Sequence, residues 1–123
     1  MGRKIVMVED SKAASAVLKE VLEAEGHTVL HAADGVTGLA LVRREHPDLV
    51  LLDLLLPKLN GYDVCNALMR DNLTRHIPVL IISTLDTPES IDKAKLCGAR
   101  NFMKKPYDLD TLLREIKRLL PKE

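Results

Sequence analysis

The segment LVLLDLLLP, residues 49–57, contains a single carboxylate, Asp53, among seven apolar residues. Its first four residues form a continuous apolar run, which is typical of a short parallel strand covered on both faces. An ionised carboxylate in apolar surroundings is unfavourable unless it is paired with a cation or bound to a metal. The segment therefore predicts a buried strand that ends at Asp53, and it indicates that this carboxylate has a partner.

Similar strand patterns occur on both sides of this segment. Residues 5–8 (IVMV) and 79–82 (VLII) are continuous apolar runs of the same kind. Residues 28–31 (TVLH) and 100–104 (RNFMK) are mixed in polarity, as strands at the edge of a sheet can be. The sequence thus predicts five strands, three of them buried.

An amphipathic helical pattern follows each strand. The first helix is expected to begin after a capping serine and to end at a glycine, and the last to end at a proline. The residues that mark these starts and ends are Ser11, Gly26, Asp34, Gly61, Thr87, Pro88, Asp108 and Pro121.

Five strand–helix units predict an α/β fold, a doubly wound parallel sheet between two helical layers. Placing the three apolar strands in the centre and keeping right-handed crossovers gives the strand order 2-1-3-4-5, which is flavodoxin-like. Ligands of such sheets bind at the carboxyl ends of the strands where the winding reverses. Here that point lies between the first and third strands.

The composition is that of one globular domain spanning residues 1–123. No apolar run is long enough to span a membrane, and no secretory signal is present, so a cytoplasmic location is expected. Cys65 and Cys97 form no CxxC pair and fall in predicted helices. Free buried thiols in a reducing compartment are favoured over a disulfide.

The formal net charge is zero, but the charges are unevenly distributed. Residues 1–92 carry nine basic and 14 acidic side chains, whereas residues 93–123 carry nine basic and four acidic ones. This bias fits either solvated helix faces or a basic docking surface for an acidic partner. Direct nucleic-acid binding is not expected, because the only aromatic residues are Tyr62, Phe102 and Tyr107.

Three carboxylates are expected to converge where the winding reverses. The first strand is followed by Glu9 and Asp10, and the third by Asp53. Their mutual repulsion would be relieved by a hard divalent cation, and Mg²⁺ prefers a few carboxylates together with water and a phosphate oxygen. Alternatively, Glu9 and Asp10 merely favour the start of the following helix.

Two other strand ends add a hydroxyl and an ammonium group to the same edge. The fourth strand ends in Ser83 and Thr84, and the fifth in Lys104 and Lys105 before a proline. With Mg²⁺ and Lys105 present, the formal charges of the three acids would cancel, so the site could admit a phosphoryl group. Once Asp53 carried it, Ser83 could donate a hydrogen bond to the new oxygens and Lys105 could pair with them.

With these features the chain resembles the response-regulator receiver domains of two-component signalling, including chemotaxis regulators, over essentially its whole length. The resemblance depends on the acidic pair, on Ser83, and on the spacing of these motifs. It also depends on the segments LLDLLLPKLNG (residues 51–61) and KLCGARNFMKKP (residues 95–106).

The resemblance implies that Asp53 accepts a phosphoryl group from a sensor histidine kinase or a phosphotransfer protein. It implies a Mg²⁺ site formed by Asp10, Asp53 and the backbone carbonyl of Leu55, with Glu9 acting through water. Lys105 matches the phosphate-binding lysine of the family, and its bond to Pro106 is expected to be cis.

The resemblance also implies a switch. Ser83 matches the switch hydroxyl, Thr84 follows it, and Phe102 matches the aromatic residue that turns inward in the active form. Ser83 stands where threonine is usual, and Phe102 lacks the hydroxyl of a tyrosine, so a switch there would act by packing alone.

Phosphorylation is expected to reshape the surface formed by the helix that begins at residue 88, the strand 100–104 and the last helix. That surface would bind a downstream effector protein, and one edge of the last helix could join a homodimer. Beyond self-catalysed phosphorylation and dephosphorylation no enzymatic activity is expected, because Leu55 stands where aspartyl phosphatases use a second acid.

Two further interpretations remain open from the residues. The first is an interaction module of receiver shape whose state does not depend on phosphate. The second is a flavin-binding protein, which would fit the fold but is opposed by the acidic cluster. The four histidines, residues 27, 31, 46 and 76, lack metal-ligand spacing and are interpreted as surface or edge residues.

Overall fold

Strands and helices alternate along the whole computed structural model, which describes residues 2–85 and 87–122. The strands are β1 (Lys4–Val8), β2 (Thr28–Ala32), β3 (Leu49–Leu52), β4 (Val79–Ser83) and β5 (Asn101–Lys104). The helices are α1 (Lys12–Ala24), α2 (Gly35–Glu45), α3 (Gly61–Arg70), α4 (Pro88–Leu96) and α5 (Leu109–Leu119).

The five strands form one parallel sheet in the order β2-β1-β3-β4-β5, which confirms the predicted order. The three apolar runs occupy the centre, and every residue of β3 and β4 is buried. The strands of mixed polarity, β2 and β5, lie at the edges. Central strands covered on both faces need apolar side chains at every position, which is why the composition of each run predicted its place.

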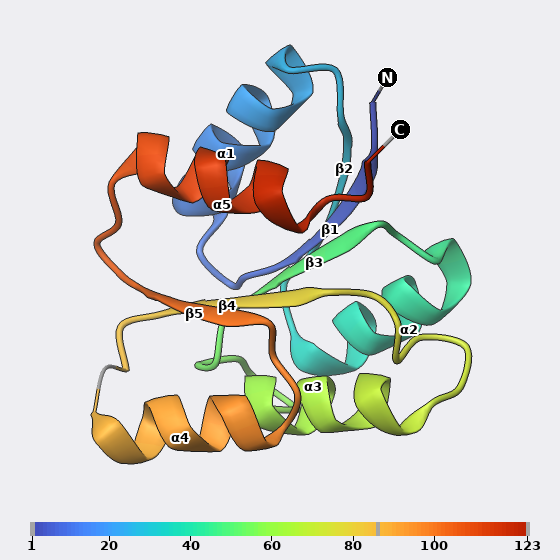
Figure 1. The fold of residues 1–123 in the computed structure, drawn as a ribbon, viewed down its shortest axis with the longest axis vertical. Coiled ribbons are helices and arrows are strands. Elements are labelled where there is room, and N and C mark those ends of the chain that lie inside the picture. Colours follow the sequence, from blue (N-terminus) through green and yellow to red (C-terminus); the bar gives the residue numbers. More distant parts are fainter. Residues whose placement is uncertain (1, 86, 123) are drawn as a thin grey trace.

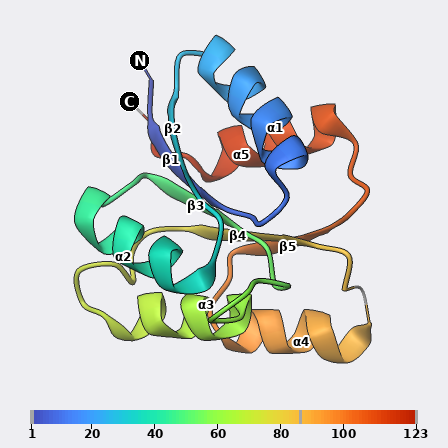
Figure 2. The same cartoon turned by 180° about the vertical axis from the view of Figure 1, so that it is seen from behind.

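Helices cover both faces of the sheet. Helices α1 and α5 lie on one side, and α2, α3 and α4 lie on the other (Figures 1 and 2). Successive side chains of a strand point to opposite faces, so β1 contributes to two cores. Val6 and Val8 pack in the cluster that includes residues of α2, α3 and α4, and Ile5 and Met7 in the cluster that includes residues of α1 and α5.

Each helix begins with a side chain that accepts a hydrogen bond from a backbone amide of its first turn. Such caps satisfy amides that have no partner within the helix. The capping residues are Ser11, Asp34, Asn60, Thr87 and Asp108. The helices start at the carboxyl edge of the sheet, and α1, α3, α4 and α5 follow strand ends and loops that carry candidate site residues.

Cys65 and Cys97 are free and buried, as expected from the sequence. The Cys65 thiol donates a hydrogen bond to the carbonyl of Cys97, and the Cys97 thiol donates to that of Ala94. Among the described residues, no helix is long and apolar enough to cross a membrane.

Candidate functional site

The site is built where β1 and β3 end side by side. Val8 and Leu52 are paired in the sheet, and the backbone amide of Asp53 donates to the Val8 carbonyl at 3.0 Å. Asp53 therefore leaves β3 next to the point where Glu9 and Asp10 leave β1. This is the place where the winding of the sheet reverses.

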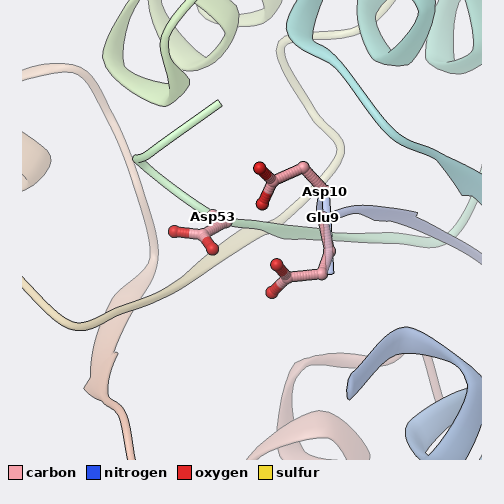
Figure 3. A group of neighbouring side chains, drawn as sticks. All are labelled: Glu9, Asp10 and Asp53. Carbon is pink, nitrogen blue, oxygen red and sulfur yellow. The ribbon is translucent and has the colours of Figure 1, made fainter. Parts of the chain in front are cut away.

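The carboxylates of Glu9, Asp10 and Asp53 face one another across this edge (Figure 3). Each offers an oxygen, and the three oxygens lie within 4.8 Å of one another. Asp53 is only 8% exposed, Glu9 is half-buried and Asp10 is exposed. Clustered carboxylate oxygens that are open to water on one side suit a hard cation such as Mg²⁺, which keeps several of its waters.

Lys105 provides the positive charge of the site. Its Nζ lies 3.0 Å from Asp53 Oδ2 and also contacts Glu9 Oε2. Burial lowers the pKa of Lys105, but the hydrogen bonds and charges of Glu9 and Asp53 outweigh this effect, so the pKa is raised overall. Lys105 is thus an ammonium ion that bridges two of the three acids, and the bond that joins it to Pro106 is cis, as predicted.

Backbone amides hold the remaining oxygens of Glu9 and Asp53. The amide of Leu55 donates to Asp53 Oδ1 at 3.1 Å, and the amide of Ser11 donates to Glu9 Oε1 at 3.1 Å. Leu55 itself is 52% exposed. The role of the Leu55 carbonyl as a metal ligand stays a prediction.

Ser83 is fully buried at the end of β4, beside β3. Its Oγ accepts a hydrogen bond from the amide of Leu85 at 3.2 Å. Among the described residues, no hydrogen bond joins Ser83 to Asp53. Thr84 is exposed. The fold therefore brings residues 9, 10, 53 and 105 into contact, while the Ser83 hydroxyl is engaged with the loop that leads to α4.

Phe102 is half-buried on β5 and packs against the same core cluster as Ala94 of α4. Its ring already lies on the face of the sheet that α4 covers. The inward turn of this ring was predicted for the active form of the protein, and it stays a prediction.

Gly61 is a site residue that the sequence marked only as a helix start and as the last residue of the segment LLDLLLPKLNG. A Cβ atom at this position would lie 2.4 Å from the backbone oxygen of Asp53 and 2.6 Å from the Cα of Leu54. Only glycine permits so close an approach of α3 to the loop after β3. The position of Gly61 shortly after the aspartate was the available signal for this role.

His31 is a second residue whose contact the sequence did not show. It lies on the edge strand β2, as expected for an edge residue, and its Nε2 is 2.7 Å from the backbone oxygen of Glu9. No motif marks this position. Its only signal is its place near the end of the strand that pairs with β1.

The comparison with protein families agrees with this geometry. The family described as the response regulator receiver domain matches residues 5–117. The chain belongs to this family. The resemblance noted from its motifs is thereby confirmed, and the acidic cluster of this receiver domain lies where its strand topology predicts a ligand site.

Its relatives include both short and long proteins. The chain is 41% identical over 117 residues to the protein PilH of Pseudomonas aeruginosa, covering 95% of this chain and 97% of PilH. Other relatives are longer, and the receiver domain spans between 26% and 50% of their length.

Solved structures share the fold. The chemotaxis protein CheY4 of Vibrio cholerae superposes with a TM-score of 0.90 at 28% identity, covering 98% of this chain and 100% of CheY4. The Mn²⁺-bound form of the response regulator Rcp1 superposes with a TM-score of 0.82 at 26% identity, covering 98% of this chain and 99% of Rcp1.

Proposed function

We propose that this receiver domain accepts a phosphoryl group on Asp53, in the presence of Mg²⁺, from the phosphohistidine of a sensor histidine kinase or phosphotransfer protein. The observation that carries the proposal is the arrangement of Asp53 between the Lys105 ammonium group and two further carboxylates. Such a set of charges is costly in an inert core. It is useful where a phosphoryl group must be bound and transferred.

In the proposed step a carboxylate oxygen of Asp53 forms a bond to phosphorus. The bond between phosphorus and the imidazole nitrogen of the donor breaks, and its electron pair stays on that nitrogen. The Leu55 amide and the Lys105 ammonium group both contact the Asp53 carboxylate, so its orientation is fixed before the donor arrives. Catalysis of phosphoryl transfer is largely positioning and charge stabilisation, which these contacts supply.

The residues present fit a magnesium ion. Glu9, Asp10 and Asp53 offer oxygens close enough to share one cation. In the proposed site, Asp10, Asp53 and the Leu55 carbonyl would hold Mg²⁺ directly, and Glu9 would hold it through water. The bound ion would supply charge neutralisation for the incoming phosphoryl oxygens. The Mn²⁺-bound relative Rcp1 supports a divalent ion as the cofactor of this site.

After transfer, we expect Ser83 to exchange its contact with the Leu85 amide for a hydrogen bond to the new phosphoryl oxygens. Lys105 would pair with the same oxygens. Movement of the loop that follows Ser83 would displace the start of α4 and change the packing of Phe102. The surface formed by α4, β5 and α5 would thereby change, and a downstream effector protein would bind it.

The proposal includes no turnover of small phosphate esters. The side chain of Leu55 is apolar and cannot serve as a general acid. A cytoplasmic location belongs to the same proposal, since free thiols at Cys65 and Cys97 fit a reducing compartment. A homodimer formed through α5 stays a prediction.

The test is phosphorylation by acetyl phosphate, followed by intact mass spectrometry. The unsubstituted protein should gain one phosphoryl group with Mg²⁺ and essentially none with EDTA. Asp53→Asn should gain none, because the amide is not a nucleophile. Asp63→Asn, which changes an exposed carboxylate on α3, should be labelled normally. Equal labelling of Asp53→Asn and the unsubstituted protein would contradict the assignment.

A second measurement distinguishes a switch from a passive module. Amide hydrogen exchange with and without beryllofluoride, a mimic of the phosphoryl group, should change in α4, β5 and α5. Unchanged exchange in a fully loaded protein would favour an interaction module whose state does not depend on phosphate.

A further inference from the structure

We propose that His31 is a positioning residue of the metal site, and that it acts by fixing the peptide between Glu9 and Asp10. The inference rests on the proposed binding of Mg²⁺ to these acids. The imidazole Nε2 of His31 lies 2.7 Å from the Glu9 backbone oxygen. A carbonyl oxygen only accepts hydrogen bonds, so Nε2 carries the hydrogen and donates it.

The imidazole replaces a backbone donor that the sheet no longer provides. The pairing of β1 with β2 ends at Val8 and Ala32, and the Glu9 amide makes one further bond to the Ala32 carbonyl at 3.0 Å. The chain then leaves the sheet, because Asp34 caps α2. Among the described loops and turns, no backbone amide donates to the Glu9 carbonyl. The His31 side chain supplies the hydrogen bond to the Glu9 carbonyl instead.

Asp10 is the acid that depends on this contact. Lys105 contacts the carboxylates of Glu9 and Asp53, so a cation already orients both. The Asp10 carboxylate is exposed and has no hydrogen bond or ion pair with another described residue. Its direction is therefore set by the backbone that carries it.

The Glu9 carbonyl and the Asp10 amide belong to one planar peptide unit. Fixing the oxygen of this unit from β2 fixes its plane, and with it the starting point of the Asp10 side chain. The backbone N–H of Glu9 belongs to the preceding peptide unit, and its hydrogen bond to the Ala32 carbonyl fixes that unit. Without the His31 hydrogen bond, the peptide unit between Glu9 and Asp10 could change its orientation. Part of the free energy of Mg²⁺ binding would then be spent on ordering Asp10.

The chain offers a matched pair of substitutions at this position. In His31→Gln the side-chain amide can reach as far as Nε2 and can donate the same hydrogen bond. In His31→Met the side chain has a similar length but carries no donor. His76→Met is the control, because His76 is exposed and makes no contact with the site.

The probe is Mg²⁺ alone, titrated calorimetrically into the protein. His31→Met should raise the dissociation constant about threefold and by no more than about tenfold, since tenfold corresponds to the whole free energy of one net hydrogen bond. His31→Gln should stay within about twofold of the unsubstituted protein, since it restores a donor. Unfolding by urea in EDTA shows whether each variant is folded. If a variant does not fold, ¹⁵N NMR of the unsubstituted protein still tests the proposal. The spectrum of the His31 ring should show a hydrogen on Nε2.

Three results would overturn the proposal. The first is unchanged Mg²⁺ affinity in folded His31→Met. The second is equal weakening in His31→Gln and His31→Met, which would indicate a packing role. The third is a neutral ring without hydrogen on Nε2. Acetyl phosphate labelling of the unsubstituted protein is measured separately, so failure of Asp53 to accept phosphate is distinguishable from failure of His31 to support the metal site.

Discussion

Charge is not balanced among the side chains of the acidic cluster. Lys105 neutralises part of the charge of Glu9 and Asp53, and Asp10 faces solvent with no cation among the described residues beside it. Without a metal ion, the formal charges of Glu9, Asp53 and Lys105 leave a net charge of −1, so Asp10 adds net repulsion to the site. A cluster that is prepared for a cation therefore costs stability until the cation binds.

Replacing Asp10 by asparagine should have opposite effects on stability with and without metal. In EDTA we expect Asp10→Asn to raise the free energy of unfolding by up to about 1 kcal/mol, since it removes repulsion from a partly solvated site. At a Mg²⁺ concentration of about 100 times the dissociation constant, the unsubstituted protein should gain roughly 2.7 kcal/mol. The variant should gain little.

Urea unfolding followed by circular dichroism measures both effects. Asp92→Asn, an exposed acid on α4, serves as the control and should respond to Mg²⁺ like the unsubstituted protein. If Asp10→Asn were less stable in EDTA, the carboxylate would have an attractive partner, and the proposed repulsion would be wrong.

The helices are anchored at the functional edge of the sheet by their caps. Two of these caps are carboxylates, Asp34 before α2 and Asp108 before α5. The pKa of Asp108 is lowered because the Thr111 hydroxyl and backbone amide donate hydrogen bonds to its charged form. The backbone amide of Thr37 lowers the pKa of Asp34 in the same way.

These caps make stability depend on pH. Because the pKa of Asp108 is lower in the folded chain, the unfolded chain takes up the proton first as the pH falls. The stabilisation by this cap is complete above the unfolded-state pKa and is lost as the pH falls through the lower, folded-state value. Asparagine caps helices about as well as aspartate but does not titrate.

Asp108→Asn should therefore leave stability near neutral pH almost unchanged and should make it fall less steeply between about pH 5 and pH 2. Urea unfolding at a series of pH values gives this slope, and the double variant with Asp34→Asn should flatten it further. An acid slope equal to that of the unsubstituted protein in both variants would show that these caps do not titrate as described.

At the scale of the whole molecule, the residues next to the site are part of the hydrophobic core. The cluster on the face of α2, α3 and α4 contains Leu52 and Leu54, which flank Asp53, and Leu68 of α3. Because protein cores are closely packed, a loss of volume at Leu68 should disturb the packing of β3, the strand that leads to Asp53. The stability of the site is thus tied to that of the fold.

A pair of identical substitutions tests whether Leu68 belongs to the core that stabilises the fold. Leu68→Ala removes a fully buried side chain and should lower the free energy of unfolding by about 2–5 kcal/mol. Leu73→Ala removes a side chain that is 67% exposed, and it should change stability by less than about 0.5 kcal/mol. Chemical denaturation measures both, and a similar cost for the two variants would contradict the division between core and surface.

Local patterns in the chain were sufficient to predict the strands and the helices, and together with the rule of right-handed crossovers they predicted the strand order. Each depends on neighbours along the sequence: apolar runs for β3 and β4, capping side chains before helices, and polarity for the edge strands. The ends of the strands then brought Glu9, Asp10, Asp53 and Lys105 to one edge, because parallel strands that pair end at the same side of a sheet.

Contacts between single atoms depended on folding in three dimensions. The ion pair of Lys105 with Glu9 joins residues 96 positions apart, and the bond of His31 to Glu9 joins residues 22 apart. The direction of the Ser83 hydroxyl and the close approach of Gly61 to Asp53 likewise depend on neighbouring elements. Hydrophobic periodicity is a property of the sequence, whereas the direction of a polar side chain is chosen by whichever donors and acceptors the folded chain places within about 3 Å of it.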